Sequence, residues 1–205
     1  DQNEEDKEHL LNAENAYKEI AKKYNFYTIE CTDNKRIKTI EEIQKTLEIC
    51  RREKLSYFIL GNGSNLLVSD QGYKGVIIQM DRNMEQITVE GTEIRAAAGA
   101  LLSSIAVAAR RASLAGFEFA GGIPGTLGGA VVMNAGAYGG EMKDVLKDVK
   151  VMTGEGEVRV IPAAELEMGY RTSIIKKAGY LVLGATISLK EGNLEEIKTL
   201  TRELR

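Results

Sequence analysis

The segment Gly61-Asn62-Gly63-Ser64-Asn65 decides how this chain is interpreted. It lies between two short apolar runs, Tyr-Phe-Ile-Leu at residues 57–60 and Leu-Leu-Val at residues 66–68. Apolar runs of this length next to turn residues are typical of β-strands, so we expect a strand on each side. Two glycines and three small polar residues form a tight loop with accessible backbone N–H groups, which suits a phosphate. An ordinary turn is the alternative interpretation.

The loop differs from the two common phosphate-binding sequences. A Rossmann fingerprint needs a third glycine and a helix after it, and here Gly61-x-Gly63 is followed by an apolar run. A P-loop needs a glycine followed by Lys-Ser or Lys-Thr at a fixed spacing, and no stretch of the chain fits. A phosphate at residues 61–65 would therefore be bound in another way.

A second glycine-rich stretch covers residues 116–140, with the sequence GFEFAGGIPGTLGGAVVMNAGAYGG and nine glycines. Its interleaved Phe, Ile, Leu, Val and Met residues are untypical of a flexible linker, so we expect an ordered backbone. Its glycines at 121, 122, 125, 128 and 129 allow the main chain to approach a ligand closely. Together the two stretches predict a site for a large flat ligand with a diphosphate between them.

Composition excludes several classes of protein. The 205 residues are 43% apolar, enough for the core of one domain or of two small ones. The net charge is −3, and no Lys/Arg block is longer than Arg110-Arg111, which argues against nucleic acid as a partner. No apolar run approaches the ~18 residues of a membrane span, and no signal sequence is present. We expect a cytoplasmic protein and favour a monomer.

Metal or thiol chemistry has little support in the sequence. Cys31 and Cys50 lie far apart, and the single histidine, His9, belongs to a charged segment. Neither pattern matches the spacing of a metal site or of a Cys–His pair. Asn62-Gly63-Ser64 matches a glycosylation acceptor, but without a secretion signal the match carries no information.

The N-terminal part predicts an amphipathic helix followed by a β-α-β-β unit. Apolar residues recur every three or four positions over residues 9–24 and again over 40–53. Thr39 and Glu42 have the spacing of a capping box for the second helix. Strands are expected within 25–37, with a turn at 32–35, on both sides of the loop within 56–69, and at 76–80.

The rest of the chain predicts two hairpins and three helical segments. The hairpins pair 87–89 with 94–98 and 145–152 with 157–161. A helix is expected over 101–114, closed by Gly116, with a helical turn at 162–166 and a last helix capped by Asn193. Two further strands are expected at 180–183 and 185–189. We divide the chain into a leader helix (1–24), a small α+β subdomain (25–83) and a larger one (84–205).

Two side chains have competing interpretations. Arg171, in Gly169-Tyr170-Arg171-Thr172-Ser173, is either a surface cation stacked on a ring or a guanidinium aimed at a carboxylate or developing oxyanion. Tyr138 is either a packed core ring or a lid over a ligand. The sequence does not separate these alternatives.

Four segments, in this order and spacing, resemble the UDP-N-acetylenolpyruvoylglucosamine reductase (MurB) family over about residues 39–205. They are GNGSNLLV at 61–68 with GVII at 75–78, GIPGTLGGA at 122–130, MNAGAYG at 133–139 and GYRTS at 169–173. The resemblance implies an α+β fold with two FAD-binding subdomains of the vanillyl-alcohol-oxidase/PCMH type, with mixed sheets flanked by helices. It implies reduction of UDP-N-acetylglucosamine enolpyruvate to UDP-N-acetylmuramate for peptidoglycan synthesis.

The resemblance also implies ligands and roles. FAD would be bound, NADPH would supply the hydride, and a UDP-sugar would be the substrate. Arg171 would be the catalytic residue, polarising the substrate carboxylate, and Tyr138, Tyr170 and Arg171 would bind the substrate. The implied FAD-binding residues are Gly61, Asn62, Gly63, Ser64, Asn65, Gly122, Ile123, Pro124, Gly125, Thr126, Gly128, Gly129, Ala130, Asn134, Ala135 and Gly136.

The chain departs from the family pattern at both ends. The family's C-terminal domain, with a serine proton donor and a glutamate partner for the substrate carboxylate, has no counterpart before Arg205. The N-terminal Thr-Phe-x-x-Gly-Gly element is replaced by Asn25-Phe26-Tyr27-Thr28-Ile29-Glu30-Cys31. We therefore expect FAD binding with poor turnover. A non-catalytic flavin- or UDP-sugar-binding paralogue is the alternative, and a flavin oxidase of the same fold is a third hypothesis.

Overall fold

The computed structural model describes residues 27–29, 32–33, 36–37, 40–80 and 84–204 of the chain. The predicted leader helix, the Thr39 cap, His9 and Cys31 lie outside these residues. Part of the predicted boundary between the subdomains, near 81–86, also lies outside them.

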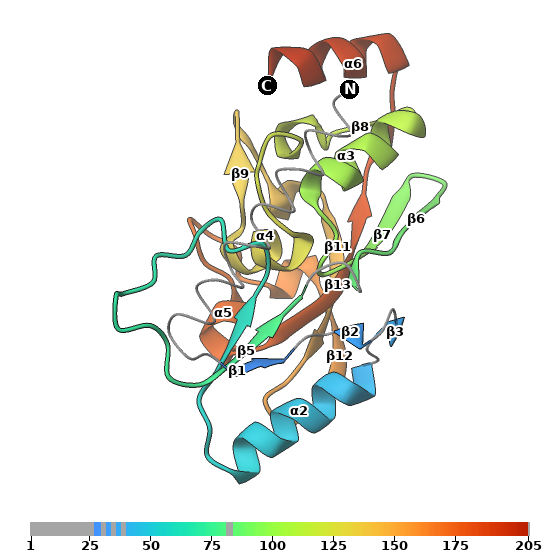
Figure 1. The fold of residues 1–205 in the computed structure, drawn as a ribbon. Helices are drawn as coiled ribbons and strands as arrows, with labels where there is room; N and C mark the ends of the chain where they lie inside the picture. Colours follow the sequence, from blue (N-terminus) through green and yellow to red (C-terminus); the bar gives the residue numbers. More distant parts are fainter. Residues whose placement is uncertain (1–26, 30–31, 34–35, 38–39, 81–83, 205) are drawn as a thin grey trace.

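Among the described residues, a three-stranded sheet and helix α2 (Ile40–Arg52) make up most of the N-terminal part (Figure 1). The sheet has the order β1 (Tyr27–Ile29), β5 (Val76–Gln79), β4 (Tyr57–Leu60), and both pairings are parallel. Within the predicted strand and turn at 25–37, β2 (Thr32–Asp33) and β3 (Arg36–Ile37) pair with each other. The helix predicted at 40–53 is α2 (Ile40–Arg52).

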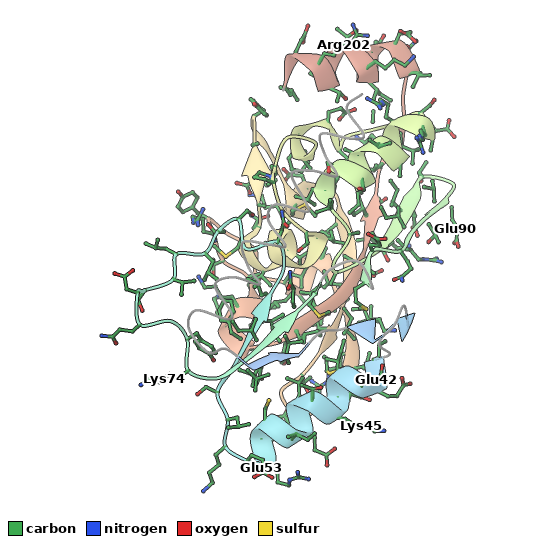
Figure 2. All side chains as sticks on the ribbon, viewed as in Figure 1. Glu42, Lys45, Glu53, Lys74, Glu90 and Arg202 are labelled. Carbon is green, nitrogen blue, oxygen red and sulfur yellow. The ribbon has the colours of Figure 1, made fainter. Side chains whose placement is uncertain are left out.

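Helix α2 is amphipathic, as its spacing predicts. Its buried residues Ile43, Leu47 and Cys50 recur every three or four positions and belong to the main apolar cluster. Lys45 is exposed on the opposite face, as Figure 2 shows. Burial of one face therefore fixes the helix against the sheet.

The strand predicted at 66–68 is absent, and the prediction is wrong. Because β4 and β5 are parallel, the chain must return from the end of β4 to the start of β5, and residues 61–75 make that return. Leu66, Leu67 and Val68 are exposed within it, with Leu67 at 97%. The apolar run thus lies in a surface loop. Residues 61–65 directly follow the carboxyl end of β4.

A five-stranded antiparallel sheet dominates the rest of the molecule, in the order β12-β11-β13-β7-β6. Both predicted hairpins are confirmed: β6 (Ile87–Glu90) pairs with β7 (Glu93–Ala97), and β11 (Leu146–Met152) pairs with β12 (Val158–Pro162). The central strand is β13 (Leu181–Ser188), whose first seven residues are buried.

The two strands predicted at 180–183 and 185–189 are one strand, because β13 runs through Gly184 and pairs on both sides. A Cβ at Gly184 would lie 2.8 Å from the carbonyl oxygen of Ala96, so only glycine fits this close approach. Gly184 was predicted to separate two strands. It instead marks a close backbone contact within one strand.

The helix predicted at 101–114 is shorter than expected. Helix α3 (Leu102–Arg111) ends at Arg111, and Ser113 adopts a left-handed conformation with φ 55°. Leu114 and Ala115 form β8, which pairs with β14 (Lys190–Glu191). Gly116 therefore follows a strand, and its predicted role in closing the helix is wrong.

The glycine-rich stretch is ordered, as predicted, and contains a helix that was not predicted. It comprises the 3₁₀ turn η2 (Glu118–Ala120), helix α4 (Leu127–Met133), and the paired strands β9 (Gly136–Ala137) and β10 (Gly140–Glu141). Gly128 in α4 packs closely on Ala98, where a Cβ would lie 3.2 Å from the Ala98 carbonyl oxygen. Helix α4 packs against β13 (Figure 1).

Short helical elements complete the structure. Two 3₁₀ turns are η3 (Met142–Asp144) and η4 (Ala163–Glu165), the latter within the predicted helical turn at 162–166. Helix α5 (Ile174–Ala178) precedes β13. The predicted last helix is α6 (Leu194–Glu203), and the Asn193 side chain accepts hydrogen bonds from the N–H groups of Glu195 and Glu196, as a cap should.

The α+β class is confirmed: the described residues form a three-stranded parallel sheet, a five-stranded antiparallel sheet and three two-stranded pairs, together with helices. Buried apolar residues form a continuous cluster that includes Ile78 of β5 and Val149 of β11. Gln44 of α2 also donates a hydrogen bond to the Gly156 carbonyl oxygen at 2.7 Å, 112 residues away. The core therefore connects the two sheets.

Candidate functional site

A cavity of about 1090 Å³ opens between the 61–65 loop, the α4 region and the segment around Arg171. Every predicted site residue lines it except Gly122. These lining residues are Gly61, Asn62, Gly63, Ser64, Asn65, Ile123, Pro124, Gly125, Thr126, Gly128, Gly129, Ala130, Asn134, Ala135, Gly136, Tyr138, Tyr170 and Arg171. A Cβ at Gly122 would lie 3.6 Å from the Leu204 carbonyl oxygen, so this glycine lies beside the end of α6.

The two glycine-rich segments contact each other directly. A Cβ at Gly61 would lie 2.3 Å from Thr126 Oγ1, a distance that side chains do not tolerate. A Cβ at Gly125 would lie 3.7 Å from Ser64 Oγ. The absence of side chains at these glycines therefore lets the 61–65 loop lie against the start of α4, forming one continuous wall of the cavity.

Only some backbone N–H groups of this wall are available to a ligand. Gly128 donates to the Ala98 carbonyl oxygen at 2.8 Å, and Gly125 donates to that of Ile123 at 3.0 Å. The N–H groups of Gly63, Ser64 and Gly129 make no backbone hydrogen bond within the described ranges. These three N–H groups are therefore candidates for binding an anion in the cavity.

Asn134 is a buried connector between three segments. It is 5% exposed, ends α4 in the left-handed conformation with φ 45°, and donates from Nδ2 to Glu141 Oε2 at 3.0 Å and to the Gly169 carbonyl oxygen at 3.3 Å. Its Oδ1 accepts a hydrogen bond from the Lys143 N–H at 3.0 Å. With both ends of the amide engaged, Asn134 positions the cavity wall.

Glu141 is held ionised in this network. Hydrogen bonds from Lys143 and from Asn134 lower the pKa of the Glu141 carboxyl below its usual value. The Lys143 Nζ lies 2.5 Å from Glu141 Oε2, and this pairing raises the pKa of Lys143. Although Glu141 lines the cavity, its charge is compensated within the protein.

Tyr138 lies in the turn between β9 and β10. It has φ 53° and is 65% exposed, so it is no core ring. Gly136 permits the tight pairing of the two strands, since a Cβ there would lie 2.6 Å from the Gly140 carbonyl oxygen. Of the two interpretations of Tyr138, the structure agrees with an exposed ring at the cavity, as a lid over a ligand would have.

Arg171 connects two walls of the cavity. Its Nη2 donates to Asn65 Oδ1 at 2.6 Å across 106 residues of sequence. Among the described residues its guanidinium is found on no aromatic ring, and the neighbouring Tyr170 is 90% exposed. Arg171 has φ 54°, a left-handed conformation that places strain at the site. Within the described ranges, the partner of the guanidinium is therefore Asn65 and not an aromatic ring.

Part of the cavity lining was not predicted from the sequence. Tyr57 and Phe58 of β4 and Tyr180 before β13 add aromatic surface to the cavity, and Lys176 of α5 adds a positive charge. Phe58 also packs against Tyr73, with ring centroids 6.0 Å apart. The sequence of β4 gives no signal for a ligand. Whether its rings line a cavity depends on which distant segments pack over the face of the sheet.

Other kinds of site find no basis in the described part of the chain. It contains no group of three or more His, Cys, Asp or Glu residues arranged for a metal ion. Burial raises the pKa of the Cys50 thiol, which makes it a poor nucleophile. No helix among the described residues has the length and apolar character of a membrane span.

Comparison with known proteins identifies relatives of this chain. Residues 35–161 match the model of a family described as FAD binding domain. UDP-N-acetylenolpyruvoylglucosamine reductases from Alkaliphilus metalliredigens and Clostridioides difficile are 49% and 47% identical over 167 and 169 residues. Each match covers 82% of this chain, and 55% and 56% of the respective relative.

A solved structure resembles the fold. The crystal structure of UDP-N-acetylenolpyruvylglucosamine reductase (MurB) from Thermus caldophilus matches with a TM-score of 0.71 and 36% sequence identity. The match covers 87% of this chain and 60% of that one. This chain thus spans about half the length of the curated relatives it matches and a larger share of the solved one.

Proposed function

The chain belongs to the FAD-binding domain family, and on that premise we propose that its cavity holds FAD for the NADPH-dependent reduction of UDP-N-acetylglucosamine enolpyruvate to UDP-N-acetylmuramate. One observation carries the proposal: the 61–65 loop, residues 123–136 and the Tyr170-Arg171 pair line one cavity, with Asn65 and Arg171 in contact. The similarity to named reductases at 36–49% identity supports the same reaction.

The residues present fit FAD. The cavity volume of about 1090 Å³ lies just above the roughly 300–1,000 Å³ that small-molecule sites span, in keeping with a ligand as large as a dinucleotide. The wall formed by Gly61 and Thr126 offers N–H groups of Gly63, Ser64 and Gly129 for the diphosphate. Tyr57 and Phe58 supply aromatic surface for planar rings.

Each segment has a separate role in the proposed reaction. FAD, when bound, would supply the hydride-transfer chemistry between NADPH and the enolpyruvyl double bond. Arg171 binds the substrate carboxylate and stabilises negative charge that develops beside it. Asn65 orients the guanidinium, and Tyr138 and Tyr170 flank the entrance and restrict water around the substrate.

The wider assignments follow from the same proposal. We assign residues 25–83 and 84–205 to two subdomains that share the ligand, with a UDP-sugar as substrate. A cytoplasmic monomer in peptidoglycan precursor synthesis is consistent with this chemistry, since the proposed substrate and NADPH are both soluble metabolites.

A non-catalytic flavin- or UDP-sugar-binding module is the second candidate function. It is favoured by the composition of the described cavity lining, in which Ser64 is the one serine and belongs to the proposed diphosphate loop. The one carboxylate of that lining, Glu141, is paired with Lys143. The lining thus offers Arg171 without a separate serine proton donor.

Anaerobic turnover distinguishes the two candidates. The FAD-loaded chain is mixed with NADPH, and loss of the oxidised flavin absorbance is followed; the enolpyruvyl sugar is then added and its reduced product quantified. We expect flavin reduction with slow product formation, in line with the poor turnover expected above. In Arg171→Ala, product formation should fall by a further roughly 10²-fold or more while FAD is still bound. Flavin reduction without product supports the binding module, and protein that takes up no FAD contradicts both.

A further inference from the structure

Lys176 is a positively charged side chain in the cavity wall that the proposed reaction does not use. It belongs to α5, is exposed, and lines the cavity. Within the described part of the chain its ammonium group has neither a hydrogen-bond partner nor an ion-pair partner. A lysine directed at solvent would need no partner, but one in a ligand cavity is available to an anion.

The charge of the lining favours such an anion. Besides Lys176, the described lining carries two ionised side chains, Glu141 and Arg171. Glu141 is compensated by Lys143, and Arg171 is directed to Asn65. The cavity therefore has an excess of positive charge, and Lys176 is the part of that excess that no protein group engages.

The surrounding contacts hold α5 against the proposed phosphate-binding wall. The Ser173 hydroxyl, directly before α5, donates to the Val132 carbonyl oxygen of α4 at 2.9 Å. Arg171, two residues earlier, is bound to Asn65 of the 61–65 loop at 2.6 Å. The segment that carries Lys176 is thus tied to both glycine-rich segments.

We propose that Lys176 binds a diphosphate group in this cavity. The inference rests on the proposed function, which brings two diphosphates to the protein, one in FAD and one in the UDP-sugar. Backbone N–H groups stabilise a phosphate by their dipoles but carry no net charge, so an ammonium group adds a charge-assisted hydrogen bond. Lysine suits this role because its charge lies on a long, flexible stem.

Lys177 provides a matched control. It is adjacent to Lys176 in the same helical turn and does not line the cavity. Its replacement by glutamine removes the same charge. Its Nζ lies 2.8 Å from Glu167 Oε2. Lysines in the last turn of a helix also stabilise its C-terminus, and that effect is shared by both residues. A loss specific to Lys176 therefore reports the ligand.

The experiment measures dissociation constants of FAD, riboflavin and UDP for the wild-type chain, Lys176→Gln, Lys176→Arg and Lys177→Gln, with circular dichroism to verify folding. Flavin fluorescence reports the flavins, and calorimetry reports UDP. We expect Lys176→Gln to weaken FAD binding about tenfold, as loss of a charged hydrogen bond does. Riboflavin, which has no phosphate, is bound equally by all variants. Lys176→Arg restores most of the affinity.

The two ligand arms identify the source of the diphosphate. A loss for FAD alone assigns Lys176 to the cofactor, and a loss for UDP alone assigns it to the substrate. FAD binding to Lys176→Gln should also depend less on salt concentration than wild-type binding, because one ionic contact is missing.

Several outcomes would overturn the inference. One is equal FAD and UDP binding by folded wild-type protein and Lys176→Gln, and another is an equal loss in Lys177→Gln. A matching loss for riboflavin would also contradict it. In each case the proposed function stands, since the wild type binds the ligands. If the wild type binds neither FAD nor UDP, the proposed function fails and the inference fails with it.

Discussion

Gly61 and Thr126 face each other where the two glycine-rich segments meet. The 61–65 loop follows a parallel strand, and Thr126 directly precedes α4. The contact is possible because residue 61 has no Cβ, which would lie 2.3 Å from Thr126 Oγ1 and 3.5 Å from Thr126 Cβ. The shape of the proposed diphosphate site therefore depends on a missing side chain at one residue and on a hydroxyl at another.

Replacing Gly61 by alanine should separate the two segments. Overpacking of this kind costs about 1–3 kcal/mol, and we expect FAD affinity to fall at least about tenfold, which corresponds to roughly 1.4 kcal/mol. The affinity is measured by flavin fluorescence and the stability by urea unfolding. Gly154→Ala is the control, because a Cβ at Gly154 meets no atom within 4 Å.

The double variant Gly61→Ala/Thr126→Ala tests the stated cause. With Oγ1 removed, the remaining Thr126 Cβ contact at 3.5 Å is ordinary packing. We expect stability to recover in the double variant, giving a coupling energy of the sign that relief of a clash requires. Additive losses from the two substitutions would show that the clash is not the cause.

Glu141 predicts a pH dependence of stability. Its pKa is lowered in the folded protein by Lys143 and Asn134, so the stabilisation is fully present above the usual value of 4.5 and is lost as pH falls through the folded pKa. We expect Glu141→Gln to be less stable than wild type at neutral pH, with the difference shrinking under acidic conditions. Urea unfolding across pH measures this, and a pH-independent difference would contradict the assignment.

At the scale of elements, those that depend on local sequence patterns were predicted correctly, and those that depend on long-range contacts were not. The hairpin of β6 and β7, helix α2 and the Asn193 cap of α6 were predictable, because each depends on periodicity or on neighbouring residues. Helix α4 was not, since Gly128 and Gly129 lower helix propensity. The reason for Gly128 is a close approach to Ala98, which only the folded chain reveals.

The same distinction applies to the candidate site. Glycine-rich composition predicted that residues 61–65 and 121–140 share one site, and residues from both segments line the same cavity. The partner of Arg171 was not predictable, because Asn65 is 106 residues away. Tyr180 and Lys176 gave no signal because their sequence context is that of an ordinary helix end and strand start.

The loop between β4 and β5 contains residues 66–68, for which a strand was wrongly predicted. Because Leu67 is 97% exposed in this return segment, we expect Leu67→Asp to change the unfolding free energy by less than about 0.5 kcal/mol. Ile78→Ala in β5 should cost about 2–5 kcal/mol, since Ile78 is buried. Chemical denaturation compares them. A large loss in Leu67→Asp would mean that this run is covered, as the strand prediction held.

At the scale of the whole molecule, one apolar core supports a cavity assembled from distant segments. Ile78 and Val149 belong to the same cluster, and Gln44 reaches the turn between β11 and β12. The cavity wall combines residues that follow β4, the start of α4 and the segment before α5. A ligand that contacts all three should bind the folded chain alone and raise its stability.

The central claim is that this cavity binds FAD, and titration of the ligand-free 205-residue chain with FAD tests it most directly. Flavin fluorescence and absorbance, followed through equilibrium dialysis, give the stoichiometry, while thermal unfolding gives the linked stabilisation. We predict one FAD per chain, a higher melting temperature with FAD, and weaker binding in Gly61→Ala than in Gly154→Ala. Folded protein that retains no FAD after dialysis, with an unchanged melting temperature, would contradict the claim.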